Sequence, residues 1–244
     1  GGYVVQIGAV KAILDEQPDH HDLYTRAEAS DVRCPFPDVA EAMHEAIRQA
    51  KIEKDTLGGI FVTYAMGVPV GLGSHVHWDR RLDARIMAAM VSIQAMKGAE
   101  IGEAFENAGK YGSQVHDMID RTEDGRLVRR SNRAGGLEGG ITTGDPIVVR
   151  VAMKPIATML RGAESVNLVT GEPELTTYER SDFCAVPRAV PIGEAMLAYV
   201  IAEALLEKLG GDSIDEMRPR YESLRQNRLS DVPMDNVDWR FGFE

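Results

Sequence analysis

Two long segments of the chain would each form a helix that is apolar on nearly every side. They run over residues 82–96 (LDARIMAAMVSIQAM) and 193–209 (GEAMLAYVIAEALLEKL). A helix on the surface of a globular protein shows one apolar stripe, so helices of this kind need cover on more than one face. The sequence therefore predicts a helical layer packed between other elements.

One polar residue interrupts the first of these segments. Gln94 would lie deep in an apolar helix, where its carboxamide must find hydrogen-bond partners or destabilise the fold. Those partners are either protein backbone or a planar polar ligand, and the sequence leaves both possibilities open.

Short runs of β-branched and aromatic residues predict strands at 3–7, 60–64 and 147–152, with a strand edge at 126–130 and a further strand at 165–170. These runs lie too close together for βαβ crossovers throughout, so we expect an α+β fold with antiparallel sheets. An amphipathic helix capped by Asp38 and a last helix from Asp212-Ser213 to about Arg228 complete the prediction. Residues 15–36 are expected to be connection and strand edge.

A single domain is expected over residues 1–228, followed by a tail, 229–244, without clear periodicity that is either loose or packed on a partner chain. No stretch has the roughly 18 to 20 consecutive apolar residues of a membrane span, and no signal segment opens the chain, so we expect a cytoplasmic protein without a membrane partner. Cys34 and Cys184 are expected to be reduced thiols. The acidic balance (pI about 5.1) argues against sequence-independent nucleic-acid binding.

His75 and His77 stand at alternate positions and would project to one side of an extended segment. A metal site needs further ligands, and no third His, Cys or paired carboxylate follows at ligand spacing. A polar loop end is therefore the favoured interpretation, and no metal is expected.

Chemistry is expected between Arg126 and Arg161. This segment carries seven basic and two acidic residues, a local charge of +5 in a chain of net charge −11. Its glycine pairs, 135–136 and 139–140, allow backbone amides to approach an anion or a flat ring, although plain β-turns explain either pair and neither fits a dinucleotide or P-loop fingerprint. Lys154 and Thr158 then offer a cation and a hydroxyl at the end of a predicted strand, an arrangement suited to an anion.

Arg180 and Asp182 would face the same way in an extended segment. The two form either a salt bridge or a proton acceptor beside an anion clamp.

Taken together, five stretches resemble chorismate synthase in order and spacing: GSHVHWDRRLDAR, SIQAMKGAEIG, SNRAGGLEGGITTGDPIVVRVAMKPIAT, ERSDFCAVPRAV and GEAMLAYVIAEALLEKLGGDS. The resemblance implies a lyase that eliminates phosphate and a proton, in a 1,4 sense, from 5-enolpyruvylshikimate 3-phosphate to give chorismate in aromatic amino acid biosynthesis. It also implies dependence on reduced FMN, with NADPH as a possible reductant, and a homotetramer. The fold implied is a helical layer sandwiched between antiparallel β-sheets.

The resemblance also implies site residues. Flavin contacts fall on Gln94, Ala95, Gly139, Lys154, Pro155, Ile156, Ala157, Thr158 and Arg180. Arg180 would in addition meet the substrate anions, since a planar guanidinium pairs with carboxylate or phosphate through two bonds. Asp182 falls where the family has an acid thought to assist deprotonation at the flavin.

The family's amino-terminal motifs are not found in these 244 residues. They include a Gly-Glu-Ser-His-Gly-type motif, several substrate-binding arginines and a second catalytic histidine. The chain is therefore expected to correspond to the carboxy-terminal larger part of the enzyme and to lack turnover alone. A non-catalytic flavin- or anion-binding module and a structural piece that binds nothing are the alternatives.

Overall fold

A five-stranded antiparallel sheet forms the centre of the computed structural model, which describes residues 1–15 and 18–232. The strand order is β2-β1-β3-β9-β4. The strands are β1 (Gly2–Ile7), β2 (Val10–Lys11), β3 (Gly59–Ala65), β4 (Met96–Ile101) and β9 (Ile147–Met153). The strands predicted at 3–7, 60–64 and 147–152 are thus confirmed. They are the three central strands of the sheet.

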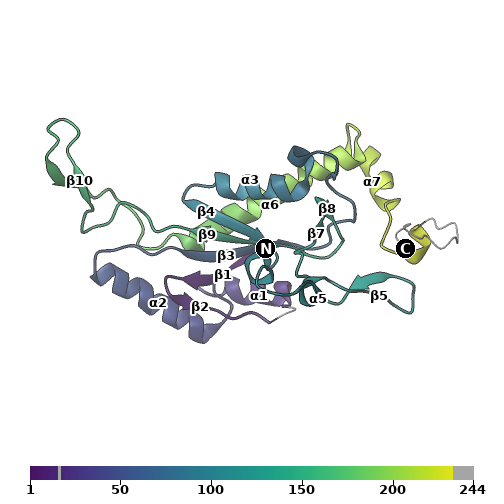
Figure 1. Ribbon diagram of the computed structural model, residues 1–244, viewed down its shortest axis with the longest axis horizontal. Coiled ribbons are helices and arrows are strands. Elements are labelled where there is room, and N and C mark those ends of the chain that lie inside the picture. Colours follow the sequence, from purple (N-terminus) through teal and green to yellow (C-terminus); the bar gives the residue numbers. More distant parts are fainter. Residues whose placement is uncertain (16–17, 233–244) are drawn as a thin grey trace.

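Two helices cover one face of this sheet, α3 (Leu82–Ser92) and α6 (Val186–Leu209). Figure 1 shows both on the same side of β3, β9 and β4. Phe61, Val149 and Val151 point from the strands into a core that α6 fills with Val190 and other buried residues. Gly193 lets α6 approach strand β3 closely, because a Cβ at this position would lie 2.7 Å from the Phe61 ring.

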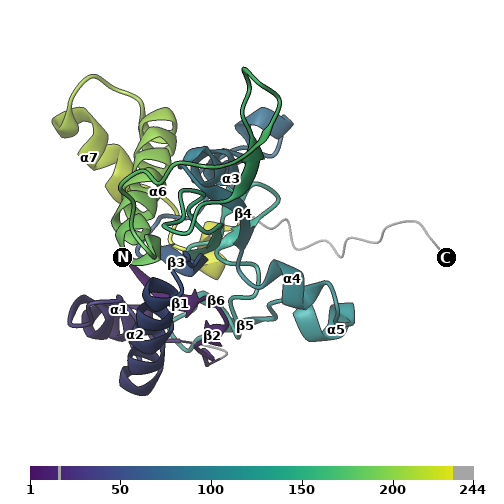
Figure 2. The same cartoon turned by 90° about the vertical axis from the view of Figure 1, so that its left-hand side faces the viewer.

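The other side of the sheet carries α1 (His20–Glu28), which Figure 2 shows beside β1. A second core forms there between α1 and the strand residues Tyr3, Val5, Val62 and Tyr64. Helix α2 (Pro37–Ile52) lies beside β1 and β2 and packs Ala40 and Met43 into the first core. Helix α1 corrects the prediction that residues 15–36 are connection: its apolar positions are few, but Leu23 and Ala27 suffice to anchor it and Asp19 caps it.

Helix α2 begins at Pro37, one residue before the predicted cap. Pro37 takes the first helical position and Asp38 lies in the first turn, while no side chain caps the helix. Proline suits that position because its missing N–H would have no partner there. The aspartate is therefore placed to interact with the helix dipole instead of capping the helix.

The remaining elements lie at the periphery. Three short hairpins are formed by β5 (Ile119–Arg121) with β6 (Leu127–Arg129), β7 (Leu137–Glu138) with β8 (Ile141–Thr142), and β10 (Glu164–Val166) with β11 (Pro173–Leu175). The short helices are η1 (Trp78–Arg80), α4 (Ala104–Asn107), α5 (Gly112–Val115), α7 (Ile214–Glu222) and η2 (Leu229–Asp231). The strand edge predicted at 126–130 and the last helix are thus present but shorter. Strand β10 shares only residues 165–166 with the strand predicted at 165–170, since 167–170 belong to the turn that follows it. Most of the 229–244 tail lies outside the described residues.

The α+β class with antiparallel sheets is confirmed, but the apolar helices differ from prediction in two respects. Helix α3 ends at Ser92, four residues early, and the chain turns at once into β4, a strand that was not predicted. Helix α6 is longer than predicted, and by length and average composition it could cross a membrane, although charged residues interrupt it and a third of its most apolar stretch is buried in this fold. The core helix of a globular protein can have the same length and composition.

Candidate functional site

Three segments that carry predicted site residues meet beyond one end of β9. The loop Lys154–Thr158 follows β9 directly, and its first amide donates to the carbonyl of Ala95 at 3.0 Å. The carbonyl of Thr158 accepts a 2.8 Å hydrogen bond from the hydroxyl of Ser181. The turn at 94–95, the 154–158 loop and the 180–182 segment are therefore held together.

The turn between α3 and β4 places Gln94 and Ala95 at the surface. Ala95 has φ +67°, in the left-handed region that residues with a Cβ seldom adopt. Gln94 lies in this turn and is exposed. The prediction that Gln94 is buried in an apolar helix is therefore wrong, because the helix ends before it, and water can satisfy its carboxamide.

The 154–158 loop offers hydrogen-bond donors that no protein acceptor uses. Among the described residues, the backbone N–H groups of Ile156, Ala157 and Thr158 have no acceptor, and the Thr158 hydroxyl makes no hydrogen bond. Lys154 is exposed and has only the neighbouring Pro155 carbonyl, at 3.3 Å from Nζ. Consecutive free amides beside a cation suit a phosphate-bearing ligand, so this donor set fits the phosphate end of FMN.

Arg180 and Asp182 do not pair with each other. Asp182 is joined to Arg188 at the start of α6, with 2.9 Å between Nη1 and Oδ2. Arg180 is exposed and makes no ion pair within the described part of the chain. The arginine is thus free for an anionic ligand, while the carboxylate is held by a cation that was not among the predicted site residues.

Gly139 lies apart from the other predicted contacts. It belongs to the β7–β8 turn, where the carbonyl of Gly140 accepts from the amide of Leu82 at the beginning of α3. Ala95 lies just beyond the opposite end of this 11-residue helix, about 16 Å along its axis. The structure does not bring Gly139 together with the 154–158 loop.

The local charge of +5 does not form one anion-binding patch. Each of the six arginines between 126 and 161 has a carboxylate within 4.0 Å, for example Arg129 with Glu138 and Asp145, and Arg161 with Asp55. Lys154 alone among the seven cations lacks such a partner in the described residues. The anion-binding capacity predicted for the whole segment therefore falls mainly on Lys154.

Residues that sequence reasoning missed hold the site in place. The buried hydroxyl of Thr56 donates to the carbonyl of Ile156 at 2.6 Å, and Ser181 does the same for Thr158. Gly58 permits close contact with the loop, because a Cβ there would lie 2.3 Å from the carbonyl oxygen of Met153. Only the Gly58-Gly59 pair gave a signal in the sequence, and it also suits an ordinary turn.

Among the residues that the structure describes, no group of three or more His, Cys, Asp or Glu side chains is placed to hold a metal ion. His75 and His77 are both exposed in the segment that leads into η1.

Comparisons with known proteins point to one family. The chorismate synthase family model matches residues 1–206. The chorismate synthase of Desulforamulus reducens is 49% identical over 225 residues, which make up 92% of this chain and 58% of that protein. That of Aquifex aeolicus is 50% identical over 229 residues, 91% of this chain and 58% of that protein.

The fold is similar to that of a solved protein of the same name. A crystal structure of chorismate synthase matches with a TM-score of 0.77 and 45% sequence identity, covering 91% of this chain and 61% of that chain. The present chain thus spans about three-fifths of the length of the proteins that it matches.

Proposed function

The chain belongs to the chorismate synthase family, and from that membership we propose that it contributes the flavin-facing wall of a phosphate-eliminating lyase. The substrate would be 5-enolpyruvylshikimate 3-phosphate and the product chorismate, an intermediate of aromatic amino acid biosynthesis. Reduced FMN, when bound, would lend electron density to the allylic system from which phosphate departs.

One observation carries the proposal: donors without protein acceptors lie where three predicted site segments meet. The amides of Ile156, Ala157 and Thr158 would bind the phosphate of the ribityl chain, with Lys154 balancing its charge. Gln94 and Ala95 would border the polar edge of the isoalloxazine, and Pro155 would line its approach.

Arg180 would contact both the flavin and the substrate, and Asp182 would act beside them. Arg180 is exposed and free of ion pairs among the described residues, so its guanidinium can bind a substrate carboxylate or phosphate through two hydrogen bonds. Asp182 would accept a proton near the flavin. The Arg188 guanidinium, 2.9 Å from Asp182, would orient that carboxylate.

We further propose that this chain binds FMN without turnover, because the family's histidine-bearing amino-terminal motifs are not among its 244 residues. In the complete enzyme the fold would assemble as a cytoplasmic homotetramer, with NADPH as a possible source of electrons for the flavin. The bare outer face of α3 and α6 is consistent with cover from further polypeptide.

Titration of the purified chain with FMN, followed by flavin fluorescence, tests the flavin site. Lys154→Gln and Arg180→Gln should each weaken binding about tenfold, the size of a lost charged hydrogen bond. Lys51→Gln, on the exposed side of α2, is the matched control and should leave the affinity unchanged. Absence of FMN binding would favour the structural-piece alternative.

Turnover is tested separately. Chorismate formation from 5-enolpyruvylshikimate 3-phosphate and reduced FMN by the chain alone would contradict the proposed lack of turnover. Turnover after the family's amino-terminal part is supplied as a second polypeptide would support it.

A further inference from the structure

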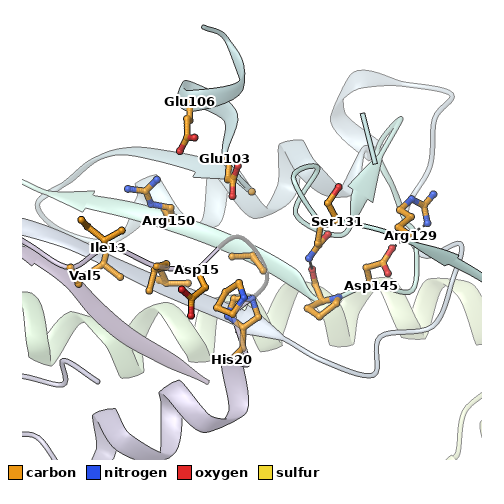
Figure 3. Close-up of a pocket in the computed structure, with 18 of the residues that line it drawn as sticks. Val5, Ile13, Asp15, His20, Glu103, Glu106, Arg129, Ser131, Asp145 and Arg150 are labelled. Atoms are coloured by element: carbon orange, nitrogen blue, oxygen red, sulfur yellow. Dashed lines mark hydrogen bonds and ion pairs between the residues drawn. The ribbon is translucent and has the colours of Figure 1, made fainter. Parts of the chain in front are cut away.

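A cavity of about 410 Å³ lies on the α1 side of the sheet, away from the proposed flavin site (Figure 3). Its apolar floor includes Val5, Val62 and Val148 from the three central strands. Its walls come from the segment after β2, from residues 102–110 and from residues 129–146. The volume is in the range of small-molecule sites, and none of the predicted flavin or substrate contacts lines the cavity.

The charged groups around the cavity are balanced. Four cations and four carboxylates line it: Lys11, Lys110, Arg129 and Arg150, with Asp15, Glu103, Glu106 and Asp145. Several of these already pair with each other, since Arg129 lies 3.1 Å from Asp145 and Lys110 lies 2.6 Å from Glu106. The charged groups that keep a free donor or acceptor decide which kind of ligand the cavity can bind.

Arg150 is the principal donor with capacity to spare. Its Nη1 is 2.8 Å from the buried carboxylate of Glu100 on the neighbouring strand. Its Nε is buried without a hydrogen-bond partner among the described residues. Lys11 makes no ion pair within 4.0 Å in the described part of the chain and adds a second cation on the same cavity.

Asp15 and His20 complete the set from the segment that joins β2 to α1. Asp15 makes no ion pair or hydrogen bond with the described residues, and its carboxylate is free for a cationic group. His20 bonds the Tyr3 hydroxyl through Nδ1 at 3.0 Å, which leaves Nε2 without a described partner. The cavity therefore presents one cation and one carboxylate without an ion pair, Lys11 and Asp15, together with one imidazole nitrogen and Arg150, whose guanidinium pairs with Glu100 through Nη1, around an apolar floor.

We propose that this cavity binds a small amphipathic zwitterion, of which an α-amino acid with an apolar side chain is the simplest example. Arg150 and Lys11 would bind the carboxylate, Asp15 the ammonium, and Val5, Val62 and Val148 the apolar side chain. An anion alone would leave Asp15 unpaired beside it, and an amine alone would face Arg150 and Lys11. The proposal is independent of the flavin chemistry.

Calorimetric titration of the whole 244-residue chain with L-phenylalanine, without flavin or substrate, tests it. Saturable binding is expected. 3-Phenylpropionate lacks the ammonium, phenethylamine lacks the carboxylate, and glycine lacks the apolar side chain, so each should bind at least about tenfold more weakly. Failure of phenylalanine to saturate the chain, or equal binding of 3-phenylpropionate, would overturn the proposal.

Two surface variants connect the binding to this cavity. Lys11→Gln and Asp15→Asn should each weaken phenylalanine binding about tenfold. Both residues are exposed, so the fold should survive, as circular dichroism would verify. Lys51→Gln and Asp31→Asn remove the same charges elsewhere and should have no effect. Equal affinity in Lys11→Gln, Asp15→Asn and the parent chain would place the binding outside this cavity and reject the assignment.

Discussion

The hydroxyl of Thr56 donates a 2.6 Å hydrogen bond to the carbonyl of Ile156, 100 residues further along the chain. Thr56 is buried, and this partly buried bond joins the turn before β3 to the proposed FMN-binding loop. Thr56→Val should cost about 1 kcal/mol of folding free energy. It should also weaken FMN binding several-fold, because the loop amides lose their fixed position. Thr56→Ser retains the hydroxyl and should preserve the affinity in the same titration.

Gly58 should not tolerate a side chain. A Cβ at this position would lie 2.3 Å from the Met153 carbonyl and 2.9 Å from the nitrogen of Pro155, and both are backbone atoms. Gly58→Ala should therefore destabilise the chain by about 1 to 3 kcal/mol in urea unfolding and displace the Lys154–Thr158 loop. Gly98→Ala is the control, since a Cβ there meets nothing within 4 Å. Equal stability of the two variants would contradict the close approach.

Gly139 should prove dispensable for FMN binding. It lies beside the beginning of α3, about 16 Å along the helix from Ala95. Gly139→Asn suits its φ of +59°, because asparagine tolerates the left-handed region, and a Cβ there meets open space. FMN affinity should stay within about twofold of the parent, in contrast to Lys154→Gln. An equal loss in both variants would show that the flavin site extends along α3.

His20 should make the fold sensitive to acid. Burial lowers its pKa below the usual 6.5, outweighing the opposite effect of Asp19. The unfolded chain then binds a proton that the folded chain resists, so this contribution to stability is complete above about pH 6.5 and is lost as the pH falls towards the folded-state pKa.

Urea unfolding at about pH 8 and about pH 5 measures this loss. His20→Gln should be less stable than the parent at the higher pH, because the hydrogen bond to Tyr3 changes. Its free energy of unfolding should nevertheless fall less than that of the parent when the pH is lowered. His44→Gln, on the exposed side of α2, should retain the parent's pH dependence. An undiminished loss in His20→Gln would assign the acid sensitivity to other groups.

The outer face of α6 should make the isolated chain self-associate. Ile192, Tyr199 and Leu206 stand two helical turns apart on this face and are 51%, 67% and 55% exposed. The double variant Tyr199→Glu with Leu206→Glu should shift the chain towards monomer in light scattering at high protein concentration. Leu168→Glu, which removes a 95% exposed leucine at the β10–β11 turn, is the control and should not change the association.

Local sequence signals were sufficient for elements with a clear period or composition. The β-branched runs at 3–7, 60–64 and 147–152 became central strands because their alternate residues fill cores on both faces of the sheet. Helix α1 was missed because its face needs only Leu23 and Ala27 once the sheet is beside it. Strand β4 was missed because MKGAEI has little β-preference, and pairing with β9 supplies what its composition lacks.

For the site, the sequence by itself determined the family and the short stretches that carry its chemistry, because motif residues are local and keep their spacing along the chain. Only the tertiary structure decided which of these stretches meet. It joined 154–158 to 94–95 through the Lys154 amide and to 180–182 through Ser181, with Thr56 and Gly58 holding the loop from the other side. It also moved Gln94 to the surface and left Gly139 at the other end of α3. It also paired the arginines of 126–161 with carboxylates, so the local charge of +5 did not form a single anion-binding patch. The physical reason is that hydrogen bonds and ion pairs depend on distances of a few ångströms between residues far apart in sequence, and only packing fixes these distances.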